Sequence, residues 1–136
     1  GLNTTANHGH AALFGVYGFL GLGLTLYCMR GLTNIQNWDQ RLLKISFWSL
    51  NAGLAMMTFL SLLPQGLWQT YNAVEHYYAF ARSAEFMHSN LMEGLVWARV
   101  PGDVVFSVGV GAFALFAWKA FVGKKEQLLE GAGSQA

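Results

Sequence analysis

Two histidines one residue apart, His8 and His10, are the residues of this chain whose type and spacing are best suited to chemistry. In an α-helix, positions two apart lie about 200° around the axis, so the two imidazoles would point to opposite sides at nearly the same depth. The ligands of a zinc ion converge instead, as histidines at i and i+4 do. Two imidazoles that point apart suit two haems, one on each side of a single helix.

A second interpretation of the same pair stays open. The spacing alone is equally compatible with two polar residues that hydrogen-bond to lipid headgroups or water at a membrane interface. The neighbouring glycines favour the haem interpretation, because a position without a side chain lets a flat ligand or another helix come close. These glycines are Gly9, Gly15, Gly18, Gly21 and Gly23.

The composition indicates a membrane protein. Of the 136 residues, 54% are hydrophobic and only 11% are charged, whereas a soluble domain has about 25% charged residues. The net charge of +1 gives no indication of nucleic-acid binding, and one cysteine, Cys28, cannot form an internal disulfide. The sequence begins at Gly1 without a signal-peptide pattern, so we expect a portion of a longer polypeptide or a processed piece of one.

The fold expected is an all-α membrane segment with three transmembrane helices, over about 6–30, 42–63 and 91–121. Pro64 should end or kink the second helix, and Pro101 should make the start of the third irregular. Aromatic and charged residues mix over about 66–90, which predicts an interfacial helical segment there. Residues 122–136 are expected to form a disordered cytoplasmic tail.

The distribution of basic residues predicts the orientation in the membrane. Three crossings place the loop after Arg30 on the same side as the C-terminal tail. Most of the basic residues fall on that side: Arg30, Arg41, Lys44, Lys119, Lys124 and Lys125. The positive-inside rule then predicts that the tail is cytoplasmic and that the histidines lie toward the periplasm of a bacterial cytoplasmic (inner) membrane.

Four stretches together resemble a known family. The chain is similar to the C-terminal part of the catalytic subunit of bacterial nitric oxide reductases, in the haem–copper oxidase superfamily, and most of all to the quinol-dependent type. The resemblance extends to about Phe121. The stretches are Asn7-His8-Gly9-His10-Ala11-Ala12-Leu13-Phe14-Gly15-Val16-Tyr17-Gly18, Leu62-Leu63-Pro64-Gln65-Gly66-Leu67-Trp68-Gln69, Tyr78-Ala79-Phe80-Ala81-Arg82-Ser83 and Arg99-Val100-Pro101-Gly102-Asp103.

The resemblance implies a fold and a set of cofactors. The three helices would be the last three of a twelve-helix bundle, His8 the proximal ligand of a high-spin haem b3, and His10 one axial ligand of a low-spin haem b. Electrons would pass from haem b to a centre of haem b3 and non-haem iron, where two NO become N2O and water. The non-haem iron ligands of the family lie on earlier helices, so the chain would act only with the remaining helices of the subunit, in contact with membrane lipid.

Several other residues have both a functional and an ordinary interpretation. In the quinol-dependent family a corresponding aspartate is placed at the quinol pocket, so Asp103 is a candidate cofactor-binding residue; an acid favoured by a helix N-terminus is an equal alternative. Arg82 and Arg99 could pair with haem propionates, or form ordinary surface pairs. The acidic and histidine residues of the interfacial segment lack ligand spacing and read as solvated; they are Glu75, His76, Glu85, His88 and Glu93.

Two alternative functions remain beside a nitric oxide reductase. One is an oxygen-reducing member of the same superfamily, which would carry copper where the reductases carry non-haem iron. The other is a small membrane electron-transfer subunit that binds haem without catalysis. The residues do not distinguish a quinol from a cytochrome c as the electron donor.

Overall fold

The computed structural model describes residues 2–133, and it is helical nearly throughout that range. The first long helix consists of α1 (Asn3–His8), η1 (Gly9–Gly18) and α2 (Phe19–Leu32). The second consists of α3 (Gln40–Met56), η3 (Met57–Leu62) and α4 (Leu63–Glu75). The third consists of α6 (Asn90–Trp97) and α7 (Val100–Gly133). Short elements join them: η2 (Ile35–Asn37), η4 (Phe80–Arg82) and α5 (Ala84–Met87).

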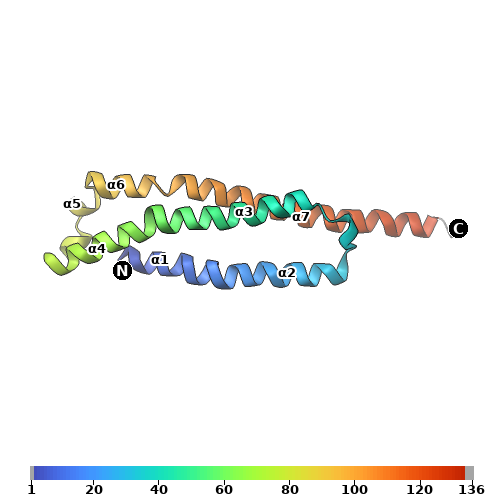
Figure 1. Cartoon of the computed structure of the whole chain (residues 1–136), viewed down its shortest axis with the longest axis horizontal. Helices are drawn as coiled ribbons and strands as arrows, with labels where there is room; N and C mark the ends of the chain where they lie inside the picture. The colour runs from blue at the N-terminus through green and yellow to red at the C-terminus, as the bar shows by residue number, and fades with distance from the viewer. Residues whose placement is uncertain (1, 134–136) are drawn as a thin grey trace.

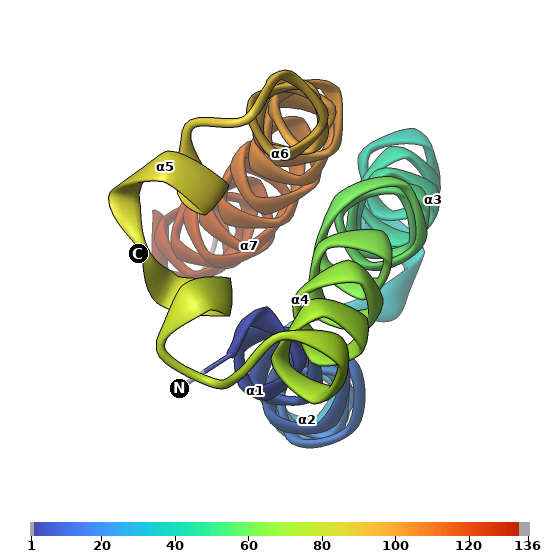
Figure 2. The same ribbon diagram turned by 90° about the vertical axis from the view of Figure 1, so that its left-hand side faces the viewer.

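Three helices are long and apolar enough to cross a bilayer, which confirms the predicted fold class. They extend over Asn3–Leu32, Gln40–Glu75 and Asn90–Gly123. They run side by side along the long axis, with α1 and the far end of α7 at opposite ends (Figure 1). Seen from the end, they stand at the corners of a triangle, and the segment from α4 to α6 crosses one end of it (Figure 2).

The second helix does not end at Pro64, where an end or a kink was expected. Pro64 stands in the first turn of α4, directly after η3, which is wound as a π-helix. The wider π turns move the preceding carbonyl away from the proline ring, and a missing N–H is tolerated at the start of a new segment. The helix therefore continues to Glu75, and residues 76–89 form the connection to α6, which contains η4 and α5.

The irregularity predicted near the start of the third helix is present, between α6 and α7. The chain leaves helical geometry after Trp97 and re-enters it at Val100, with Pro101 in the first turn of α7. The helix then continues to Gly133, well past the predicted end near Phe121. The expected disordered tail is thus helical as far as Gly133, and its last residues, 134–136, lie outside the described residues.

Among the described residues, the most extensive helix packing is between α3 and α7. Added Cβ atoms would lie 2.5 Å from the Phe106 nitrogen at Gly53, 2.8 Å from the Met57 nitrogen at Gly102, and 2.8 Å from Leu50 at Gly109. The three partner positions on α3 and η3 fall at i, i+3 and i+7, and those on α7 at i, i+4 and i+7, so each set lies on one helix face. Small residues of this kind allow membrane helices to approach at backbone distance.

Buried glutamines connect the three helices at the histidine end. Gln69 Oε1 accepts a hydrogen bond of 2.7 Å from the Asn3 backbone, and Gln65 Oε1 accepts one of 3.0 Å from the Asn3 amide. Gln65 also donates to Ser61, whose hydroxyl donates to the Leu95 carbonyl. Both glutamines are almost fully buried. Their hydrogen bonds are therefore stronger than in water, and breaking one would leave a buried polar group without a partner. They fix α1 and α6 against the second helix.

The opposite end is closed by a capped loop. Asp39 is the N-cap of α3, where its carboxylate accepts from the Arg41 and Leu42 backbones, and it pairs with Lys119 of α7 at 3.1 Å. The Leu42 N–H and the Lys119 ammonium hold the pKa of Asp39 below its ordinary value. Beside it, Trp38 packs edge-on against the buried Phe116.

The glycine contact between α3 and α7 gives a first prediction. Replacing Gly53 by alanine places a methyl group against the α7 backbone and must push the two helices apart. We expect a loss of about 1–3 kcal/mol in the stability of the parent protein, seen as a lower midpoint of thermal unfolding.

The matched control is Gly111→Ala on α7, where an added Cβ meets no atom within 4 Å. Alanine there should leave the midpoint unchanged or raise it, because alanine favours a helix more than glycine does. Equal midpoints for the two variants would show that the α3–α7 contact does not depend on the glycine.

Candidate functional site

One cavity in the structure is lined by a side chain that could ligate a metal, His10. It has a volume of about 640 Å³ and lies where η1 faces the junction of α3 and η3 and the beginning of α7. Its polar side chains are His10, Arg99 and Asp103. The remaining walls are apolar and consist mainly of Ala6, Leu13, Phe14, Leu54, Met57 and Phe106. The structure therefore brings together three of the residues singled out from the sequence, although they are far apart along the chain.

The hydrogen bonds of His10 determine which of its ring nitrogens carries the proton. Nδ1 lies 2.9 Å from the Ala6 carbonyl, which can only accept, so Nδ1 is the donor. Nε2 lies 3.3 Å from Nη2 of Arg99, and a guanidinium can only donate, so Nε2 presents its lone pair. This tautomer, assigned from its neighbours, is the one in which an imidazole ligates a metal through Nε2 while a carbonyl orients the ring.

Arg99 is itself held by an acid one helical turn away. Its Nε lies 3.2 Å from Oδ1 of Asp103, and both side chains are partly exposed. Asp103 stands in the first turn of α7, where the helix dipole favours a carboxylate. An exposed pair of this kind contributes little to stability. Its effect is positional, because it keeps the guanidinium at the mouth of the cavity beside His10.

His8 lies apart from this cavity. It is the last residue of α1, its side chain is exposed, and it lines none of the described cavities. The helix that carries both histidines is also the least covered of the three. Only 6% of its most apolar window is buried, against 39% for the second helix. Most of the surface around His8 is therefore open to groups that this chain does not supply.

The backbone around the histidines is unusual. From Gly9 to Gly18 the chain is wound as a π-helix, a rare geometry that often marks functional sites. An added Cβ at Gly9 would meet no atom within 4 Å, so the helix surface between the two imidazoles is open. Buried side-chain oxygens nearby, Asn7 Oδ1 and Thr58 Oγ1, have no hydrogen-bond partner among the described residues.

These features fit an imidazole-ligated flat prosthetic group such as haem. The site offers apolar walls, a cation at the edge, and an oriented Nε2 lone pair that accepts from Arg99 in this structure and becomes a ligand when the guanidinium moves aside. Within the part of the chain that the structure describes, no three histidine, cysteine or acidic residues lie close enough together to hold a metal ion. A polydentate metal site is thus not formed by these residues alone, whereas a single axial imidazole is available.

The other candidates lie outside the cavity. The Arg82 guanidinium lies 5.5 Å from the centre of the Tyr78 ring and does not line the cavity. His88 and Glu93 pair at 3.4 Å with both side chains largely exposed, and His76 packs edge-on against Phe80. Phe14 contacts Phe106 and Phe19 edge-on, so it packs across the floor of the cavity.

Sequence reasoning did not identify the residues that position the site. Gln65 and Gln69 fix the histidine helix against α4, and the glycine contacts place Arg99 and Asp103 opposite His10. A signal was present in the first case, because two glutamines four residues apart in an apolar segment must have buried partners. The apolar walls from Leu54 and Phe106 had no comparable signal.

Comparison with known proteins gives one result. Residues 1–105 match the protein family described as cytochrome c and quinol oxidase polypeptide I. No curated protein matches the chain. The matched region contains His8, His10, Arg99 and Asp103, and therefore every polar residue of the cavity.

Proposed function

The chain belongs to the cytochrome c and quinol oxidase polypeptide I family, and from this we propose that it forms the last three helices of the catalytic subunit of a nitric oxide reductase. The family consists of haem-binding oxidoreductases whose catalytic polypeptide is a multi-pass, twelve-helix membrane bundle. Family membership covers both oxygen-reducing and NO-reducing enzymes. The finer assignment rests on the stretches 62–69, 78–83 and 99–103, which resemble the reductases.

The observation that best supports haem binding is the orientation of the His10 ring and the tautomer that its hydrogen bonds indicate. We propose that its Nε2 is an axial ligand of a low-spin haem b and that His8, exposed on the same helix, is the ligand of a high-spin haem b3. The Ala6 carbonyl orients the His10 ring. Each histidine supplies one imidazole, so the second ligand of haem b comes from another helix of the subunit.

The reaction proposed is 2 NO + 2 e⁻ + 2 H⁺ → N2O + H2O. When bound, the haems supply electron transfer and an iron at which NO is reduced, together with a non-haem iron held by residues outside this chain. The residues of this chain line the site and orient its polar groups. Phe14, Leu54 and Phe106 form apolar walls beside the His10 imidazole, and Asp103 holds Arg99 at the cavity, where its guanidinium can pair with a haem propionate.

Asp103 is also placed to meet a quinol. Its carboxylate borders the cavity and also an outer groove of about 480 Å³ on α7, whose other lining residues are Val100, Val104, Ser107 and Val108. A largely apolar groove with a carboxylate acceptor suits a quinol ring with a hydroxyl donor. The alternative donor is a cytochrome c, in which case Asp103 acts only on Arg99. The proposed location is a bacterial inner membrane, with the histidines toward the periplasm.

The haem assignment predicts selective spectral losses. In the purified parent complex, His10→Ala should remove the low-spin b signal from the reduced-minus-oxidised visible spectrum, and His8→Ala should remove the high-spin signal. His88→Ala is the matched control, since this exposed histidine lies outside the cavity. Wild-type spectra in both His8 and His10 variants would exclude these residues as ligands.

The choice between NO and oxygen as substrate rests on the second metal. We expect the parent protein to contain iron beyond its two haem irons and no copper, by elemental analysis against haem content. It should also consume NO with formation of N2O, measured with an NO electrode and gas chromatography. Stoichiometric copper together with oxygen reduction would assign the chain to the oxygen-reducing branch. Two haems without either activity would favour a non-catalytic electron-transfer subunit.

The quinol assignment predicts a split between kinetic constants. Asp103→Asn should raise the KM for a quinol by about 10-fold or more, the worth of one hydrogen bond to a charged group, while turnover with an artificial one-electron donor is retained. Asp39→Asn at the opposite end of the bundle serves as the control. An unchanged KM would show that Asp103 does not bind the quinol and that its role is limited to the contact with Arg99.

A further inference from the structure

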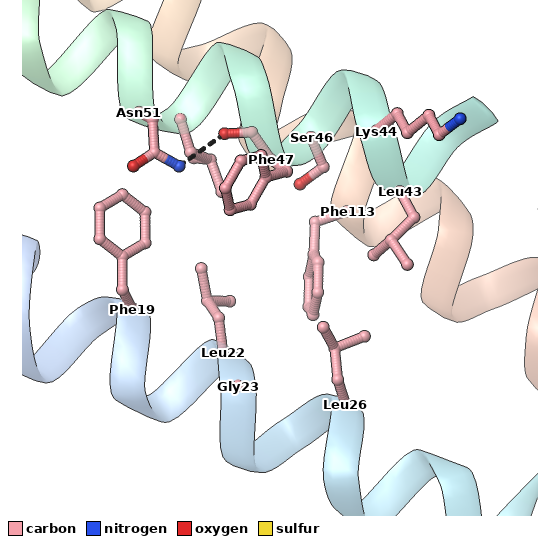
Figure 3. A pocket seen from close by; sticks show the side chains of 11 residues that line it. Phe19, Leu22, Gly23, Leu26, Leu43, Lys44, Ser46, Phe47, Asn51 and Phe113 are labelled. Carbon is pink, nitrogen blue, oxygen red and sulfur yellow. Dashed lines mark hydrogen bonds between the residues drawn. The ribbon is translucent and has the colours of Figure 1, made fainter. Parts of the chain in front are cut away.

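A second cavity lies in the half of the bundle away from the histidines. It has a volume of about 560 Å³ and opens between α2 and α3, with α7 behind it. Figure 3 shows Phe19, Leu22 and Leu26 reaching into it from α2, and Phe113 from α7. Phe19 packs edge-on against Phe14, so this cavity lies beyond the floor of the histidine cavity in the same interhelical space.

The cavity is apolar along its length and basic at one end. The polar group of Asn51 is engaged within α3, because its amide donates to the Phe47 carbonyl at 2.8 Å. Lys44 lines the end nearest the loop that joins α2 to α3 (Figure 3). Its side chain is exposed and forms no ion pair among the described residues. Arg41 lies one turn before it on α3.

The shape and lining of the cavity suit an extended chain. From Phe19 to Leu26 the axis of α2 rises about 10 Å, and apolar side chains line the cavity over that distance. An extended hydrocarbon chain fits along this length, and Gly23 widens the space, since an added Cβ there meets no atom within 4 Å.

We propose that this cavity binds one anionic phospholipid, with an acyl chain along Phe19, Leu22 and Leu26 and the phosphate at Lys44. Charge complementarity supports this choice. Basic pockets between transmembrane helices bind the headgroups of anionic lipids, and Lys44 stands at the end of the bundle that also carries Arg30, Arg41 and Lys119. The lipid would fill a space between helices that this chain's own side chains leave open. This inference does not depend on the identity of the reduced substrate.

The test uses the parent protein in phosphatidylcholine nanodiscs that contain phosphatidylglycerol with a photoactivatable group in its acyl chain. After irradiation, labelled peptides are identified by mass spectrometry. We expect labelling of the peptides that contain Leu22, Leu26 and Phe113. Gly23→Leu should abolish it, because the new side chain occupies the cavity from a position whose Cβ has open space around it. The matched control is Gly21→Leu, which also projects into open space but does not line the cavity.

The headgroup is tested separately. Lys44→Gln should weaken labelling by phosphatidylglycerol about fivefold, the contribution expected of one lysine near a lipid phosphate, whereas Arg41→Gln should have less effect. Photoactivatable phosphatidylcholine should label wild type about as weakly as phosphatidylglycerol labels Lys44→Gln. Absent labelling in wild type, which would follow if another protein segment covers the cavity, overturns the proposal. So does equal labelling by both lipids, or labelling that survives Gly23→Leu.

Discussion

The contact between α3 and α7 is the constraint on which the rest of the structure depends. Membrane helices have little hydrophobic driving force toward one another, so close backbone packing must supply the association. Gly53 and Gly102 permit that packing because they have no side chain at the crossing. The crossing sets the depth and rotation of α7, and therefore the position of Arg99 and Asp103 opposite His10.

The two ends of the bundle are held in different ways. At the histidine end, Gln65 and Gln69 connect α1, α4 and the following loop by buried hydrogen bonds. At the other end, Asp39 caps α3 and pairs with Lys119, and Trp38 packs on Phe116. Between these ends the first helix touches its neighbours little. The two cavities lie in this loosely packed middle, where groups from outside the chain have room to bind.

Much of the fold could be predicted from the sequence because apolar length and sparse charge determine membrane helices. Spacing also predicted that His8 and His10 point to different sides of one helix, and in the structure only His10 lines the cavity. The contact of His10 with Arg99, 89 residues later, was beyond such reasoning, because it depends on how closely α3 approaches α7. The continuation of the second helix beyond Pro64 to Glu75 was not predicted, since a π-type stretch before a proline cannot be recognised from residue types.

The widened turns of η1 have a consequence for the whole first helix. Each residue in a π-helix advances the chain by a smaller rotation than in an α-helix, because more residues complete one turn. Ten such residues accumulate into a phase offset between the histidines and α2. The segment thus sets the rotation of α2 relative to the histidines. Phe19, Leu22 and Leu26 face the second helix, whereas His10 faces Arg99 of the third. The relative orientation of the two cavities around the first helix therefore depends on the length of η1.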